Sequence, residues 1–416
     1  MHVRGRWIAA GVATLLMFGL VIIQAPVMRV ALYAAEPIKL GEVGPLSPPG
    51  GYEDGKLMLD AAQMAVEEIN AAGGVLGRPI KLIEADTRGK PEEGTAAAER
   101  LITQEKVVAV FGEFHSGVFL AEMEVAHKNG IPIVAVDVWN NMITAKGYAE
   151  VFRVAPCQAI IANRYADWIA AAGFKNVLVM YEKTPGGEGH LEVLRPGLDK
   201  HKVHYDVVGV DLNQTEFTAQ FQRLLAHKPP YDLLAAAYSE AGIYPMVNQA
   251  KSLGFAPTAK TGMYDSGGPA TTEAFWKNVK EAGVGLVTEN PGLPKAKWNA
   301  KTKAFVAAFE KKFKTSTTPQ SMESYDAAYI VVDAIKRAGS TDPKAIIRAL
   351  ETSKWKGTRG AYAFSTSHTP DWAYHQFVDA PLYLLQYDKV GQKPEDAPVI
   401  WPRSLATVPY TYLKPK

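Results

Sequence analysis

The sequence of 416 residues contains only one cysteine, Cys157. A single cysteine excludes an internal disulfide, a cysteine-rich zinc site and an iron–sulfur cluster within one chain. We interpret Cys157 as a buried small apolar residue rather than a reactive thiol. The chain also lacks a strongly basic run, since the nearest candidate, "FEKKFKTS", has the pattern of an amphipathic helix. Nucleic acid is therefore not expected as a partner.

The motifs of several enzyme classes are missing as well. The stretch "FGEFHSG" sets His115 beside Ser116, but it lacks the flanking glycines of the elbow that exposes a hydrolase nucleophile. The stretch "TPGGEGH" matches neither a dinucleotide fingerprint nor a phosphate loop. His201 and His204 have no acidic ligand at helical spacing beside them. We therefore expect no catalytic residue, no metal and no cofactor.

Acidic residues are absent from the first 35 positions. Arg4 and Arg6 precede an apolar run from Trp7 to Ile23, which is the layout of a secretory signal peptide. We expect cleavage after Ala34 or Ala35, and the alternative is an uncleaved anchor, because the run approaches the length of a membrane span. Removal of this segment changes the formal charge from +2 to −1, because it carries three arginines.

The rest of the chain alternates short β-branched runs with amphipathic segments. "IKLGEVG", "PIKLIEAD", "VVAVFG" and "IPIVAVDV" have the pattern of strands, with helical patterns between them. After "VFRVAP" a second series begins, in which "NVLVMYE", "YDVVGVDL" and "YDLLAAAYS" are the predicted strands. Such alternation predicts parallel βαβ units. We expect an α/β protein with two doubly wound, Rossmann-like lobes, since the length suits two domains.

Aromatic and polar side chains follow the predicted strands. Ligands of open parallel sheets bind where strands end and helices begin, so these side chains are candidates for a binding pocket. They are Tyr52, Ser116, Trp139, Asn140, Tyr238, Ser239, Tyr264 and Asp265. These residue types bind through stacking, hydrogen bonds and one fixed charge, which indicates a site for a small molecule rather than a reaction centre.

Nearly the whole chain after the signal segment resembles a known family. The resemblance is carried by "IKLGEVGPLSPPGG", "AVEEINAAGGVLGRPIKLIEAD", "AERLITQEKVVAVFGEFHSG", "NGIPIVAV", "VFRVAP" and "YDLLAAAYSEAGIYPMVNQAKSLGF". The family is that of the type I periplasmic solute-binding proteins of ABC importers, in the branch of leucine/isoleucine/valine-binding and amide- or urea-binding receptors.

The resemblance implies two lobes joined by three chain crossings that act as a hinge. The crossings are expected near residues 153 to 156, 286 to 290 and 360 to 365. The expected division is a signal peptide at 1–35, a first lobe of 36–154 with 287–362, and a second lobe of 155–286 with 363–416.

The resemblance also implies roles for individual residues. Tyr52 would flank the ligand, Ser116 and Gly117 would meet its carboxylate or other polar head, and Asp265 would receive an ammonium group. Tyr238 and Ser239 would form the neighbouring wall in the second lobe. Trp139 stands where amino-acid binders commonly have a small hydroxyl residue, which puts an ordinary branched-chain amino acid in doubt.

The expected function is therefore that of a periplasmic receptor that is not an enzyme. It would be a monomer that captures a small polar or zwitterionic solute, such as an amino acid, an amide or a small carboxylate. Hinge closure would trap the solute for delivery to an ABC permease in the inner membrane. The alternatives are a ligand sensor for a signalling partner and, less favoured by the residues, a cleft hydrolase.

Overall fold

The computed structural model describes residues 36–212 and 214–415. The signal peptide predicted at 1–35 lies outside the described residues. Two large sheets and a two-stranded hairpin of β11 (Trp355–Gly357) and β12 (Gly360–Tyr362) organise the described chain. The α/β fold with two lobes is thus confirmed, and we use "first lobe" and "second lobe" for each large sheet with the helices that pack on it.

The first sheet is parallel and has the order β2-β1-β3-β4-β5. Its strands are β1 (Ile38–Gly44), β2 (Ile80–Asp86), β3 (Val110–Gly112), β4 (Ile133–Ala135) and β5 (Val151–Arg153). The helices of this lobe are α1 (Tyr52–Ala71), α2 (Pro91–Glu99), α3 (Ser116–Asn129), α4 (Met142–Ala145), α10 (Ala300–Phe313), α11 (Pro319–Ala338) and α12 (Pro343–Glu351).

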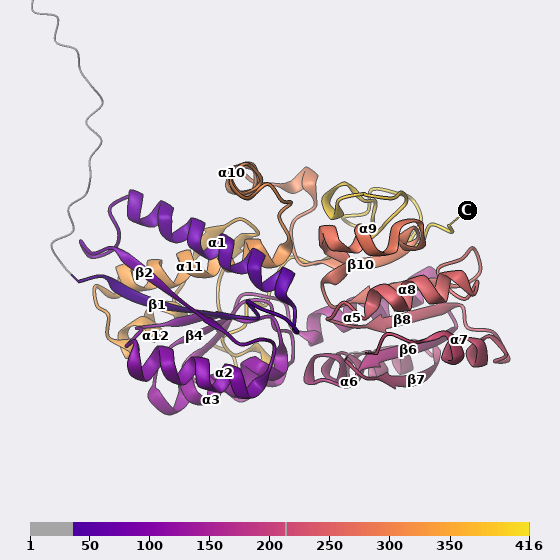
Figure 1. Cartoon of the computed structure of the whole chain (residues 1–416), viewed down its shortest axis with the longest axis horizontal. Helices are drawn as coiled ribbons and strands as arrows, with labels where there is room; N and C mark the ends of the chain where they lie inside the picture. The colour runs from indigo at the N-terminus through magenta and orange to yellow at the C-terminus, as the bar shows by residue number, and fades with distance from the viewer. Residues whose placement is uncertain (1–35, 213, 416) are drawn as a thin grey trace, which may run out of the picture. The chain divides into compact units, whose positions relative to one another are not determined.

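Alternating side chains divide the core of the first lobe into two layers. Leu40 and Phe111 point into the core formed with α1, α11 and α12, whereas Val43 and Val110 point into the core formed with α2 and α3. Helix α11, far along the chain, lies beside α1 (Figure 1). The period of two along each strand therefore lets one sheet bury both of its faces, as expected of a parallel sheet.

The second sheet has seven strands in the order β14-β13-β10-β9-β8-β6-β7. The five strands from β10 to β7 are parallel, and β13 and β14 pair antiparallel at one edge. The strands are β6 (Asn176–Glu182), β7 (His204–Val210), β8 (Leu233–Ala237), β9 (Gly262–Ser266), β10 (Leu286–Asn290), β13 (Tyr383–Gln386) and β14 (Val399–Trp401).

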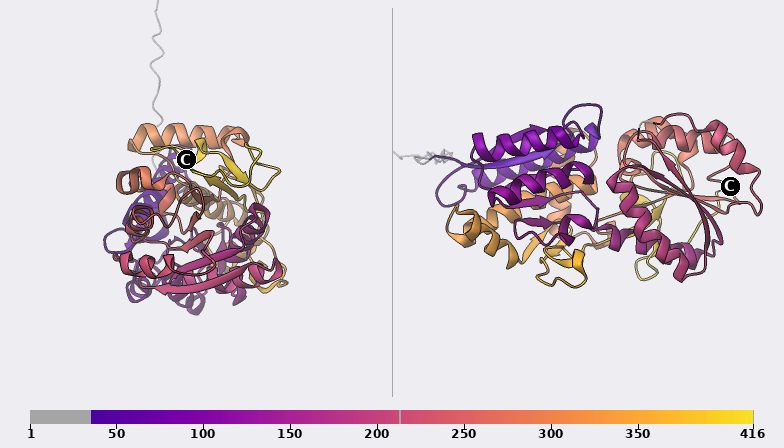
Figure 2. Two further views of the ribbon diagram at one scale, coloured as in Figure 1. Left: turned by 90° about the vertical axis from the view of Figure 1, so that its right-hand side faces the viewer. Right: turned by 90° about the horizontal axis from the view of Figure 1, so that it is seen from below.

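Five helices cover the second sheet, on both of its faces (Figure 2). They are α5 (Gln158–Ala172), α6 (Pro185–Lys200), α7 (Thr218–Leu225), α8 (Ile243–Ser252) and α9 (Glu273–Val279). Tyr165 and Leu194 bring α5 and α6 onto one face, while Phe221 and Met246 bring α7 and α8 onto the other. The thick apolar core holds the strand ends, and thus the loops that follow them, in fixed positions.

Local signals set the starts of the helices that matter for the site. Thr184 accepts a hydrogen bond from the Gly187 amide at the start of α6, and Pro185 occupies the first helical position. Thr318 and Ser321 form a capping box at the start of α11. Both helices therefore begin at defined residues close to the ends of strands.

The chain passes between the two sheets after β5, after β10 and before β13. Strand β10, residues 286–290, pairs within the second sheet, and Phe364, Phe377 and Ala380 pack in the core of the first lobe. These packings differ from the division expected from the sequence at its two later boundaries. We therefore propose a first lobe of 36–154 with 291–380 and a second lobe of 155–290 with 381–416.

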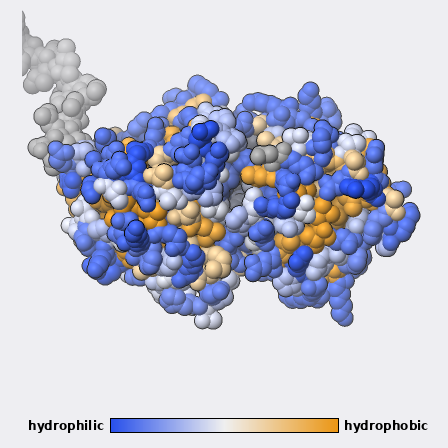
Figure 3. Space-filling view, turned by 60° about the horizontal axis from the view of Figure 1, so that its bottom comes forward, coloured by the Kyte–Doolittle hydropathy of each residue, from blue (hydrophilic) through white to orange (hydrophobic). Residues whose placement is uncertain are grey.

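The surface is mostly hydrophilic where Figure 3 shows it, with smaller hydrophobic patches between. Large apolar side chains with substantial exposure include Leu76, Met142 and Leu225. Across the described chain, every helix is too short or too polar to cross a lipid bilayer.

Candidate ligand-binding site

A cavity of about 180 Å³ lies between loops of the two lobes. From the first lobe it is lined by the segment 114–118, after β3, and by Asp137 and Trp139, after β4. From the second lobe it is lined by Glu182, by residues 184–187 at the start of α6, and by the residues that end β8 and β9. It thus occupies the carboxyl ends of both parallel sheets, where ligands of such sheets bind.

The start of α3 presents hydrogen-bond donors to this cavity. Ser116 is the first residue of α3, and its Oγ accepts the backbone amides of Trp139 and Asn140, each at 3.2 Å. A hydroxyl that accepts two hydrogen bonds keeps its own proton for a further acceptor. The first amides of a helix also lack partners within the helix and carry the positive end of its dipole. The lining at Ser116 and Gly117 therefore suits an oxygen acceptor or an anion.

Trp139 forms part of the cavity wall, and a hydrogen bond to a buried carboxyl group fixes its indole ring. Its Nε1 donates to Asp137 Oδ1 at 2.9 Å, and the residue is 6% exposed. The carboxyl group of Asp137 interacts electrostatically with that of Glu323 on α11. Burial and the charge of Glu323 raise the pKa of Asp137 well above its ordinary value.

Arg359 links this carboxyl pair to the chain crossings. Its guanidinium is fully buried, forms an ion pair with Glu323 and donates to the carbonyl oxygens of Val154 and Pro291. Val154 lies in the first crossing and Pro291 in the second. Although burial lowers the pKa of Arg359, the surrounding charges and bonds, with Glu323 foremost, raise it above the ordinary value. The permanently charged guanidinium group of Arg359 therefore fixes both chain crossings behind the cavity.

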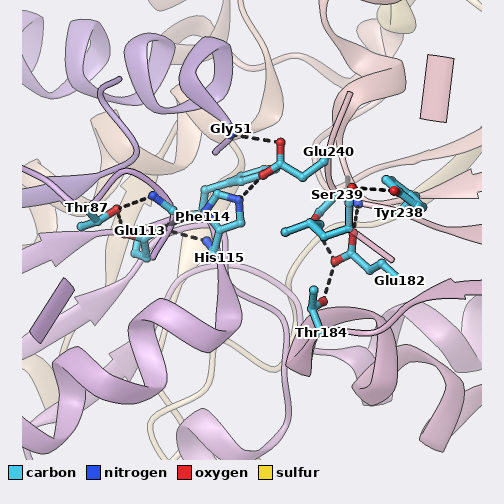
Figure 4. Close-up of polar contacts among 12 residues, drawn as sticks. Gly51, Thr87, Glu113, Phe114, His115, Glu182, Thr184, Tyr238, Ser239 and Glu240 are labelled. Atoms are coloured by element: carbon cyan, nitrogen blue, oxygen red, sulfur yellow. Dashed lines mark hydrogen bonds and ion pairs between the residues drawn. The ribbon is translucent and has the colours of Figure 1, made fainter. Parts of the chain in front are cut away.

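The wall in the second lobe is organised by Glu182, the last residue of β6. Its carboxylate accepts the Ser239 amide and hydroxyl, both at 2.8 Å, and the Thr184 hydroxyl at 2.7 Å (Figure 4). Burial raises the pKa of Glu182, while these hydrogen bonds act in the opposite direction. The ends of β6 and β8 are thus joined at the cavity by one carboxylate.

The two lobes contact each other beside the cavity through His115 and Glu240. His115 Nε2 lies 2.6 Å from Glu240 Oε1, and the Gly51 amide donates to Glu240 Oε2 at 3.2 Å (Figure 4). The other ring nitrogen of His115 lies 3.3 Å from Glu113 Oε1. Burial alone would lower the pKa of His115, but its bonds to Glu113 and Glu240 raise it to about 10. At neutral pH the imidazolium therefore forms an ion pair with each carboxylate.

A second contact between the lobes joins the loop after β4 to the start of α6. Asn140 Nδ2 donates to the carbonyl oxygen of Pro185 at 2.6 Å. Gly117 also lies against Pro185, because a Cβ atom added to the glycine would stand 3.3 Å from Pro185 Cγ. The starts of α3 and α6 are therefore in close contact over the cavity.

Of the nine residues expected at the site, Ser116, Gly117, Trp139, Tyr238 and Ser239 line the cavity. The other four occupy different positions. Tyr52 is the first residue of α1 and is 43% exposed, and Asn140 bridges the lobes as described above. Tyr264 is fully buried and stacks on Tyr165, with ring centroids 4.1 Å apart.

Asp265 is also fully buried and lies outside the cavity lining. Neither of its carboxylate oxygens has a hydrogen-bond partner among the described residues. Burial, together with the charges of Glu289 and Glu182, raises the pKa of Asp265 well above its ordinary value. Because Asp265 is buried and does not reach the cavity, this geometry does not favour the ammonium-binding role that the resemblance implies.

The cavity also contains residues that the sequence analysis did not select. Glu182 ends a run with a strand pattern and Asp137 is next to last in another, so an acid near a strand end was the signal for them. Gln158 begins α5, and no strand-end pattern points to it. His190 is the last residue of "TPGGEGH", the stretch after a predicted strand, and lies one turn inside α6. His115, considered in the sequence only as the neighbour of Ser116, lines the cavity and forms the contact with Glu240. In the described residues no group of three or more His, Cys, Asp or Glu is arranged to hold a metal ion.

Comparison with known proteins agrees with this arrangement. Residues 37–392 match the family described as periplasmic binding protein. An amino acid binding protein of Pseudomonas aeruginosa is 30% identical over 234 residues, which cover 55% of this chain and 61% of that protein. The alignment thus spans less than two thirds of that relative's length.

Two further proteins match over most of their length. The Leu/Ile/Val-binding protein homolog 3 of Brucella melitensis is 28% identical over 76% of this chain and 84% of its own. A solute-binding protein of an R. palustris ABC transporter, solved with benzoate, superposes with a TM-score of 0.75 at 21% identity, covering 88% of this chain and 95% of that one. The chain therefore belongs to the periplasmic binding protein family, as a type I solute-binding protein of the leucine/isoleucine/valine-binding branch.

Proposed function

We propose that this protein is the extracytoplasmic receptor of an ABC importer, which captures a small polar or zwitterionic solute by hinge closure and delivers it to a membrane permease. The observation that carries this proposal is the cavity between the two lobes, whose walls come from the ends of strands in both sheets. A ligand bound there touches both lobes, so it stabilises the closed arrangement through contacts that the open arrangement lacks.

The chemistry of the lining supports a ligand of amino-acid size. The volume of about 180 Å³ is below the range of roughly 300–1,000 Å³ that is typical for drug-sized ligands. Phe114, Val118 and Trp139 offer an apolar wall, and Ser116 with the amides at the start of α3 offers donors for a carboxylate. The relatives named above are described as binding amino acids or leucine, isoleucine and valine, and one was solved with benzoate. We therefore place amino acids and small carboxylates first among the candidate ligands.

The proposed location is the periplasm, reached through a signal peptide in residues 1–35. The family of binding proteins supports this location, and the basic and apolar order of those residues supports the signal peptide. Expression of the full chain in a Gram-negative host, followed by cell fractionation and N-terminal sequencing, tests both points. A periplasmic protein that begins near residue 35 is expected, and an intact N-terminus in the membrane fraction would indicate an anchor.

The ligand is best identified from the protein itself. Mass spectrometry of small molecules released from the secreted protein, followed by isothermal titration calorimetry with amino acids, amides and aromatic acids, is the decisive experiment. A ligand present at 100 times its Kd should add about 2.7 kcal/mol to the free energy of unfolding. Recovery of the unchanged compound supports a receptor, whereas its conversion to a product would contradict the proposal.

A further inference from the structure

Three neutral side chains form a hydrogen-bonded chain that ends at the cavity. Tyr264 Oη lies 3.1 Å from His190 Nε2, and His190 Nδ1 lies 3.0 Å from Gln158 Oε1. The residues come from β9, α6 and α5, and they are 0%, 1% and 4% exposed. His190 and Gln158 line the cavity, whereas Tyr264 lies behind them. The chain therefore connects the buried interior of the second lobe to the wall of the cavity.

The direction of each hydrogen bond follows from Tyr264. Its hydroxyl is fully buried, and a buried hydroxyl proton needs an acceptor. Among the described residues, the hydrogen-bond partner recorded for this hydroxyl is His190 Nε2, so Nε2 accepts. Burial lowers the pKa of His190 to about 3, which makes the imidazole neutral. A neutral imidazole carries one proton, which must then lie on Nδ1 and be donated to Gln158 Oε1.

This order fixes the amide of Gln158. Since its oxygen accepts from His190, its NH₂ group faces the other way, and this group has no recorded acceptor among the described residues. The backbone amide of Gln158 donates to the carbonyl oxygen of Trp139 at 2.7 Å, which holds the start of α5 against the cavity wall. The free NH₂ group therefore opens onto the cavity that the residue lines.

We propose that Gln158 recognises the ligand by donating a hydrogen bond from its NH₂ group to a carboxylate or carbonyl oxygen. Tyr264 and His190 position the Gln158 amide for this role. This inference rests on the function proposed above and names the chemistry that its site selects. The described residues that line the cavity include neither lysine nor arginine, and both ring nitrogens of His115 face Glu113 and Glu240. Neutral donors are therefore left to bind the ligand oxygens. An ammonium group at the same place would face the hydrogen atoms of the Gln158 amide and would be rejected.

The tautomer of His190 can be measured without any ligand. In protein labelled with ¹⁵N-histidine, the two ring nitrogens are distinguished by NMR, and a His190→Gln variant assigns the signals. We expect a protonated Nδ1 and an unprotonated Nε2 that do not titrate between about pH 5 and 8, since the ordinary pKa near 6.5 is strongly lowered by burial. The Tyr264→Phe variant should lose this single tautomer. A protonated Nε2 in the wild-type protein would overturn the inference.

Binding of stated probes gives the second test. Leucine, benzoate and putrescine are titrated by calorimetry into the full secreted chain and into its Gln158→Glu variant. The variant keeps an oxygen for His190 but presents an acceptor to the cavity, so leucine or benzoate should lose about tenfold or more in affinity. Tyr264→Phe should give a smaller loss, and Gln222→Glu, on the exposed face of α7, should give none.

The outcomes separate the two proposals. Unchanged affinity of Gln158→Glu for the carboxylate that the wild type binds would overturn the role of Gln158. If the wild type binds no candidate ligand and releases none, the proposed function is contradicted, while the His190 tautomer still decides whether the amide is oriented as described. Tighter binding of putrescine by Gln158→Glu than by the wild type would support the selection against ammonium groups.

Discussion

His115 Nε2 lies 2.6 Å from Glu240 Oε1, so a side chain that precedes α3 in the first lobe meets one that follows β8 in the second. Glu240 lies outside the cavity lining, and its other oxygen accepts the amide of Gly51. Glu240 can therefore stabilise the closed arrangement of the lobes without contacting a ligand. It differs in this respect from Ser116 or Trp139, whose side chains form the wall itself.

Removal of the charge of Glu240 should weaken ligand binding from outside the cavity. We expect Glu240→Gln to lower affinity by about tenfold, because hydrogen bonds to charged groups contribute roughly 1.5–3 kcal/mol. The loss should appear mainly as faster release, measured by stopped-flow tryptophan fluorescence. Glu281→Gln, which changes an exposed acid of the same lobe, is the matched control. If the Glu240→Gln variant releases ligand at the wild-type rate, the contact does not hold the lobes closed.

The same pair predicts a dependence on pH. Burial lowers the pKa of His115, but its bonds to Glu113 and Glu240 raise it from its ordinary 6.5 to about 10. The charge of His115 in turn acts to lower the pKa of Asp54 and of Glu182. The stabilisation that protonated His115 gives to the closed, folded protein is therefore complete below pH 6.5 and is lost as the pH rises through 10. We expect affinity to fall between neutral pH and pH 10 by calorimetry, and His115→Gln to flatten this fall. A fall of equal size in the variant would assign it to another group.

The alternation of strands and helices could be read from the sequence because it depends on local patterns. Runs such as "NVLVMYE" and "YDLLAAAYS" became β6 and β8, since a strand buried on both faces must be apolar along its length. The two later lobe boundaries depend instead on packing between distant segments. Phe364 and Phe377 reach the first core only in three dimensions, and no local pattern shows this.

The sequence predicted that the site lies at the strand ends, but it did not predict which way individual side chains point. Tyr264 and Asp265 are neighbours on β9, so their side chains point to opposite faces of the sheet, and neither reaches the cavity lining. Gln158 and His190 enter the cavity from helices, where a polar residue gives no distinctive signal. Asp137 and Glu182 were visible as acids at strand ends, but their roles became clear only from their partners.

The buried ion pair behind the cavity predicts a large effect on stability. Arg359→Met leaves Glu323 without its positive partner and the carbonyl oxygens of Val154 and Pro291 without a donor. We expect a loss of about 3–5 kcal/mol in the free energy of unfolding, as is typical when one partner of a buried pair is removed. Urea denaturation of the ligand-free protein measures it.

Low pH should partly restore the stability of the Arg359→Met variant. Burial raises the pKa of Glu323 to about 7, and the charge of Arg359 opposes that rise, so without the arginine the carboxyl should be protonated still more readily. A group whose pKa is raised in the folded state stabilises it below the ordinary pKa and loses that contribution as the pH rises through the folded value. The loss caused by Arg359→Met should therefore be smaller at pH 5 than at pH 8. An equal loss at both values would mean that the charge of Glu323 is not its cause.

Close contact between Gly117 and Pro185 predicts a way to hold the lobes apart. A Cβ atom at Gly117 would lie 3.3 Å from Pro185 Cγ, so alanine needs a small adjustment and the branched side chain of valine a larger one. We expect Gly117→Val to bind ligand more weakly than Gly117→Ala, while Ala121→Val on the same helix stays near wild type. Small-angle scattering with saturating ligand should give a larger radius of gyration for Gly117→Val than for the control. Equal compactness and equal affinity in the two proteins would show that closure does not require α3 and α6 to meet at this glycine.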